Sequence, residues 1–71
     1  MRDTIISEMS SSYAEQINNY KTTVESYLNS NTEATSSFDI ITETEKNLDL
    51  MVKYHYRLEL MESYFPVTGS L

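Results

Sequence analysis

His55, Glu59 and Glu62 are the residues whose types and spacing come nearest to a site of chemistry. A helix would place the three side chains on one side, where an imidazole nitrogen and carboxylate oxygens suit a divalent metal. A helical His four residues before a Glu is, however, more often a surface pair, and three ligands from one helix lack a converging fourth. We therefore expect no metal site.

Catalysis requires a nucleophile with a base in reach, or paired carboxylates in a sheltered cleft. The chain has 71 residues, one His and no Cys, so it offers neither a thiol nucleophile nor a disulfide framework or thiolate metal site. A domain this short also buries a small share of its surface. We expect no enzyme and no cofactor.

The charge balance argues against two further classes of partner. Five basic and eleven acidic side chains give a net charge of −6, which opposes binding to nucleic acid or to an anionic membrane surface. The longest aliphatic run, Leu50 to Val52, is far short of the roughly 20 residues of a membrane span, and the acidic, hydroxyl-rich start is unlike a secretory signal. We expect no nucleic-acid partner, no membrane span and a cytoplasmic location.

The first helix is predicted over about 4–28. Its apolar positions recur in steps of three or four, as on one face of a helix. Asp3 or Thr4 is a suitable cap, whereas Ser12 with Glu15 has capping-box spacing and would begin the helix later. Three tyrosines recur every seven residues with Ile17 and Val24 between them, so we expect a loosely packed coiled-coil-like seam: Tyr13, Tyr20 and Tyr27.

A second helix is predicted over about 36–65, after a turn at about 29–35. Asn29 begins a run of short polar side chains that compete with helix, and Pro66 ends the second helix, leaving residues 67–71 as a frayed tail. A short connection makes the two helices antiparallel neighbours. The fold class is thus all-α, a two-helix hairpin forming a single domain over residues 1–71.

The second helix carries apolar side chains on two opposite sides. One stripe is Ile40, Met51, Tyr54, Leu58, Met61 and Phe65, and the other is Phe38, Val52, Tyr56 and Leu60. The single seam of the first helix can cover one stripe only, so we expect a protein partner on the other. We expect the stripe with Val52, Tyr56 and Leu60 to face outward.

The two stripes of the second helix and the seam of the first lead to two sets of predicted residues. The predicted hairpin core is Tyr13, Ile17, Tyr20, Val24, Tyr27, Leu48, Met51 and Leu58. The predicted partner-binding residues are Val52, Tyr54, Tyr56, Leu60, Met61, Tyr64 and Phe65. Without a partner, we expect the chain to be marginally stable or to form homo-oligomers.

The segment Leu50-Met51-Val52-Lys53-Tyr54-His55-Tyr56-Arg57 carries a family resemblance. Within a small acidic hairpin that has no Cys and a polar turn, it resembles the late second helix of the small type III secretion needle co-chaperones, the YscE/SsaE-like family. The resemblance implies a protein that packs against a helical-repeat chaperone. Together the two would keep the needle subunit soluble in the bacterial cytoplasm before export.

Two other classes stay open. One is a secreted structural subunit, either a needle-like hairpin or a small Trp-x-Gly-type export substrate, although residues 29–33 contain no Pro, Trp or Gly. The other is a phage or plasmid inhibitor that binds a host protein.

Overall fold

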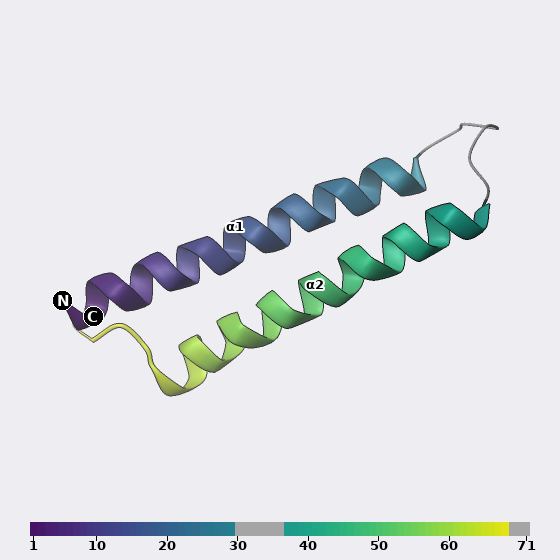
Figure 1. Cartoon of the computed structure of the whole chain (residues 1–71). Helices are drawn as coiled ribbons and strands as arrows, with labels where there is room; N and C mark the ends of the chain where they lie inside the picture. The colour runs from purple at the N-terminus through teal and green to yellow at the C-terminus, as the bar shows by residue number, and fades with distance from the viewer. Residues whose placement is uncertain (30–36, 69–71) are drawn as a thin grey trace.

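The computed structural model describes residues 1–29 and 37–68 and contains two long helices, α1 (Arg2–Leu28) and α2 (Ser37–Tyr64). The helices lie side by side and antiparallel, so that Met1 and Thr68, the first and last described residues, lie at one end of a rod (Figure 1) measuring 53 × 17 × 15 Å. The predicted all-α hairpin is confirmed. Beyond Asn29, the predicted turn falls outside the described residues.

α1 begins earlier than any of the predicted caps. Its N-cap is Met1, whose side chain makes no capping bond, and the Ile5 N–H donates to the Met1 carbonyl at 3.1 Å. Ile6 is buried against α2, with 7% of its surface exposed. Because tertiary packing supplies most helix stability in proteins, burial of Ile6 holds this first turn without a side-chain cap.

The two helices meet along a heptad-spaced seam. Most of their buried and half-buried residues follow alternating steps of three and four, the spacing of a coiled coil. In α1 these positions are Asp3, Ile6, Ser10, Tyr13, Ile17, Tyr20, Val24 and Tyr27. In α2 they are Ile40, Thr44, Asn47, Met51, Tyr54, Leu58 and Met61.

Polar residues occupy part of this seam, and one of them corrects the predicted core. Asn47 is half-buried, whereas its neighbour Leu48, predicted as core, is 44% exposed. The Asn47 side-chain amide donates to the Glu43 carbonyl at 2.8 Å, and the Thr44 hydroxyl donates to the Ile40 carbonyl at 2.7 Å. Such bonds to the preceding turn let short polar side chains sit in a helix interface.

The interface between α1 and α2 is thin. Among the described residues, only Ile6 and Val24 are buried, at 7% and 9% exposed, and both belong to α1. Within residues 1–29 and 37–68, eleven large apolar side chains are exposed instead. A two-helix hairpin has one contact face, so each helix leaves most of its circumference in solvent.

The segment after α2 returns to the start of α1. The helical bond pattern continues to Phe65, whose N–H donates to the Met61 carbonyl at 2.9 Å, and Pro66 cannot donate the next bond. Thr68 then donates from both its N–H and its hydroxyl to the Asp3 carboxylate at 3.1 Å. The helix ends before Pro66, as predicted, and within the predicted tail Thr68 contacts Asp3 of α1; residues 69–71 lie outside the described part.

Candidate protein-binding surface

Tyr54 lies at the centre of the hairpin. Its ring centroid is 6.0 Å from that of Tyr13 and 6.0 Å from that of Tyr20, with interplanar angles of 38° and 18°. The phenol of one helix is thus held between two phenols of the other, a geometry in which aromatic pairs attract. Tyr54, predicted to bind a partner, is turned toward α1 by its heptad position.

Two cations cover the outer side of this aromatic cluster. Lys53 Nζ lies 5.6 Å and the Arg57 guanidinium 5.5 Å from the centre of the Tyr54 ring, within the range of cation–π attraction. Both basic side chains of the segment from Leu50 to Arg57 are thereby directed to one flank of α2.

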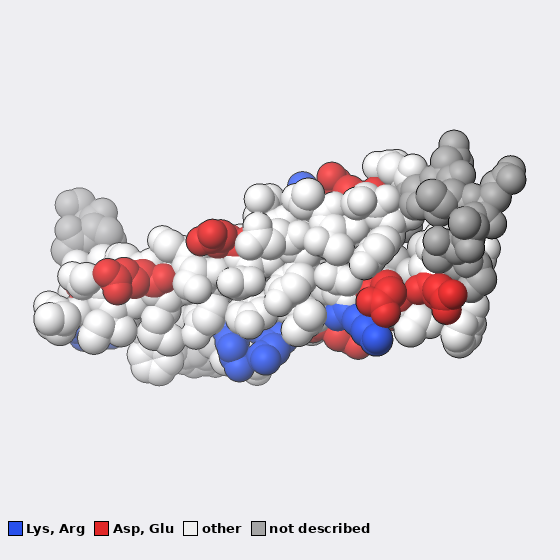
Figure 2. Space-filling model, turned by 45° about the horizontal axis from the view of Figure 1, so that its top comes forward, with Lys and Arg blue, Asp and Glu red and all other residues white. Residues whose placement is uncertain are grey.

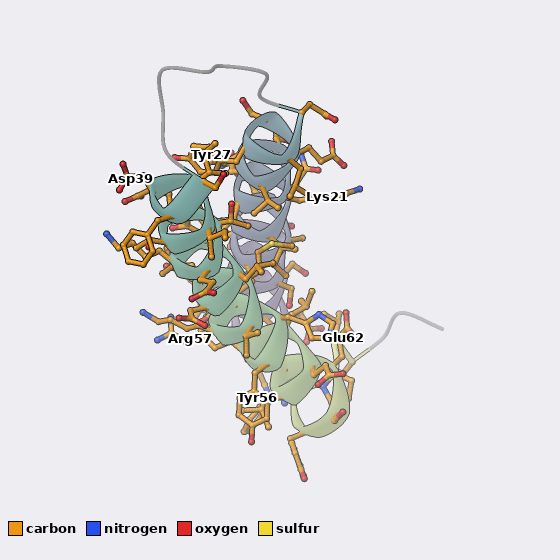
Figure 3. The ribbon with its side chains drawn as sticks, turned by 90° about the vertical axis from the view of Figure 1, so that its right-hand side faces the viewer. Lys21, Tyr27, Asp39, Tyr56, Arg57 and Glu62 are labelled. Atoms are coloured by element: carbon orange, nitrogen blue, oxygen red, sulfur yellow. The ribbon has the colours of Figure 1, made fainter. Side chains whose placement is uncertain are left out.

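The other predicted core residues lie along the seam. Val24 is buried, and the remainder are half-buried: Tyr13, Ile17, Tyr20, Tyr27, Met51 and Leu58. Figure 3 shows Tyr27 between the two helices near the end that carries the connection. Leu48 departs from this set, as described above.

Exposed apolar side chains on α2 border a groove of about 660 Å³, which we call the α2 groove. Val52 is 67% and Tyr56 59% exposed, and Tyr56 points away from α1 (Figure 3). The residues that line the α2 groove are Ile17, Leu48, Met51, Val52, His55, Tyr56 and Glu59. Two predicted partner-binding residues, Val52 and Tyr56, therefore lie together on an accessible surface.

The other predicted partner-binding residues lie around two further hollows. Leu60, half-buried, and Tyr64, exposed, border a polar hollow of about 470 Å³ beside Tyr56. Met61 and Phe65 line an apolar groove of about 480 Å³ at the end of the rod, together with Arg2, Ile5, Ile6 and Met9. Ile5 and Met9 were missed by the sequence analysis, although their four-residue spacing beside the seam is an available signal.

Two of the three residues considered for metal binding, His55 and Glu59, form a surface pair. His55 Nε2 lies 3.4 Å from Glu59 Oε1, and both side chains are exposed. Within residues 1–29 and 37–68, no three His, Asp or Glu side chains are grouped closely enough to hold a metal ion. The pair instead forms part of the rim of the α2 groove.

The charged side chains are spread along both helices. Figure 2 shows acidic groups scattered over the visible face, with most of the visible basic groups along its lower edge and one at its upper edge. One local pair joins Lys46 Nζ to Glu43 Oε1 at 3.1 Å. In the described part of the chain, neither helix combines the length and the apolar character needed to cross a membrane.

No family model, no curated protein and no solved structure matches the chain.

Proposed function

We propose that this protein is a small helical adaptor that works by binding another protein through the α2 groove. The observation that carries the proposal is the exposure of Leu48, Val52 and Tyr56 beside one another on α2. Contiguous apolar surface with an aromatic residue at its centre is typical of protein interfaces. The small buried core supports the same proposal, because a hairpin with little interior gains stability from a partner.

The specific form of the proposal is a co-chaperone of type III secretion. It rests on the resemblance of residues 50–57 to the YscE/SsaE-like family. In this role the partner is a helical-repeat chaperone, and the two proteins together keep a needle subunit soluble in the bacterial cytoplasm before export. Tyr54 contributes to this role from inside the hairpin, by fixing the α2 surface that Val52 and Tyr56 present.

The test is expression of the chain alone and together with the products of its neighbouring genes. We expect a one-to-one complex with a larger helical protein, and more soluble protein than from the chain alone. Val52→Asp places a charge in the α2 groove and should release the partner. The matched control is Leu28→Asp, at an equally exposed apolar position at the last residue of α1, away from the α2 groove.

Circular dichroism of both variants verifies that the hairpin is intact. Retention of the partner by Val52→Asp would remove the α2 groove as the binding surface. A soluble, monomeric chain that acquires no partner from any neighbouring gene would contradict the co-chaperone function.

A further inference from the structure

Three carboxylates lie beside the exposed apolar stripe of the α2 groove. Glu45 and Asp49 lie three residues before Leu48 and Val52, and Glu59 lies three residues after Tyr56. Residues three apart are neighbours on a helix surface, so all three carboxylates flank the exposed apolar stripe. Glu59 also lines the groove itself.

The basic residues of α2 lie on its other flank. Lys53 and Arg57 sit over the Tyr54 ring, and Lys46 pairs with Glu43. Figure 3 shows Arg57 on one side of the hairpin and Glu62 on the opposite side. Lys21 of α1 points to the same side of the hairpin as Glu62 (Figure 3), so α1 contributes a basic side chain to that side.

A second copy of the chain is a poor occupant of this groove. A two-fold contact that brings Val52 against Val52 on antiparallel helices sets Leu48 against Tyr56 and Glu45 against Glu59. Symmetry repeats every contact of such an interface, so the carboxylates would meet twice. Each copy also carries a net charge of −6, which opposes association.

We propose that the α2 groove takes an amphipathic helix of a partner protein, with apolar residues on one face and Lys or Arg beside them; this rests on the proposed function. From Leu48 to Tyr56 the stripe rises about 12 Å, about two helical turns. Apolar side chains four residues apart on the incoming helix match the spacing of Leu48, Val52 and Tyr56. Its flanking cations face Glu45, Asp49 and Glu59.

The probes are two synthetic 18-residue helices with the same leucine stripe, one flanked by Lys and the other by Glu. Their binding is measured by fluorescence anisotropy at low and at high salt. We expect the Lys-flanked helix to bind about tenfold more tightly at low salt, and the difference to shrink at high salt because ions screen exposed charges.

Two variants with the same net charge distinguish the effect of the rim carboxylates on binding from the effect of the overall negative charge of the chain. The rim variant is Glu45→Gln with Glu59→Gln, and the remote control is Glu8→Gln with Glu15→Gln, two exposed positions of α1. Both remove two negative charges. We expect the rim variant to weaken binding of the Lys-flanked helix about fivefold and the control to weaken it less than twofold.

Equal effects of the two variants, or equal binding of the two probes, would overturn the charge inference. If Val52→Asp abolishes binding of the natural partner while the rim variant retains it fully, the α2 groove is the binding surface. The proposal that the partner helix carries Lys or Arg beside its apolar face is then refuted. If neither variant affects the natural partner, the proposed function fails as well. Self-association through Val52, measured by sedimentation, with no binding of either probe would identify a second copy as the occupant and refute the proposal.

Discussion

The Tyr54 ring of α2 stacks on the Tyr20 ring of α1, with centroids 6.0 Å apart and planes inclined by 18°. This contact, with the one to Tyr13, makes Tyr54 a link between the helices rather than a surface residue. It lies midway along the seam of α2, between Met51 and Leu58. The contact between the two helices therefore depends on Tyr54, although the sequence alone assigned this residue to partner binding.

Replacement of Tyr54 by Ala should destabilise the hairpin by about 2 kcal/mol. The estimate is below that for a fully buried aromatic ring because Tyr54 is only half-buried. Urea unfolding monitored by circular dichroism measures the effect. Tyr64→Ala is the matched control, since Tyr64 is 70% exposed and should change the unfolding free energy by less than about 0.5 kcal/mol. Equal losses in the two variants would refute the central role of Tyr54.

The contact between Asp3 and Thr68 should be measurable as a coupling free energy. Asp3→Ala removes the acceptor of three bonds and a negative charge near the N-terminus of α1, so we expect a loss of about 1 kcal/mol. In a Thr68→Val background the loss should be smaller, because the side-chain bonds are already absent. Strict additivity in this double-mutant cycle would show that the Thr68 hydroxyl contributes nothing to the effect of Asp3.

Two substitutions test whether Asn47 or Leu48 lies in the seam. Asn47→Leu puts apolar surface into the interface and should raise the unfolding free energy by about 1 kcal/mol. Leu48→Asn changes an exposed position and should alter stability little. Thermal melts of the two variants at matched concentration decide the register, and a larger loss from Leu48→Asn than gain from Asn47→Leu would place Leu48 in the seam.

The free protein should unfold over a broad temperature range, or self-associate through apolar surface outside the α2 groove. For chains of this size, about 25 cal/mol per Å² of buried apolar area nearly balances about 1.5 kcal/mol of entropy per ordered residue, and only two described side chains are buried. Calorimetry over a tenfold concentration range gives the answer. A sharp transition above about 70 °C that does not depend on concentration would contradict this prediction.

The hairpin was predictable because periodicity extends over many residues, whereas the choice of Asn47 over Leu48 for the seam was not. Apolar spacing and Pro66 together placed both helices, since these signals accumulate along the chain. One step in sequence rotates a helical residue by about 100°, so the choice between Asn47 and Leu48 depends on which stripe α1 covers. Hydrophobicity favours Leu48, but the seam continues through Thr44 and Asn47, whose amide and hydroxyl bond to the preceding turn.

The contact of Thr68 with Asp3 was not predictable for a different reason. The two residues are 65 positions apart, and no local pattern at either one indicates the other. Pro66 indicates only that the helix stops, and the direction of the following segment is decided by tertiary contacts. The α2 groove was predictable in part. The spacing of apolar residues identified Val52 and Tyr56, but the carboxylates beside them were recognised as its rim only from the structure.

The final prediction concerns the face of α2 that a partner contacts. Tyr56→Ala with Leu60→Ala should release a helical partner while leaving the helix content nearly unchanged, because Tyr56 points to solvent and aromatic residues at the centre of an interface typically contribute about 2 kcal/mol or more. Tyr54→Ala with Met61→Ala should instead unfold part of the hairpin, since both residues lie on the seam. Pull-down of the co-expressed partner and circular dichroism distinguish the two effects. Full retention of the partner by the Tyr56 and Leu60 double variant, with loss in a Tyr54 and Met61 variant that remains folded, would reverse the assignment of the faces; retention by both would move the interface away from α2.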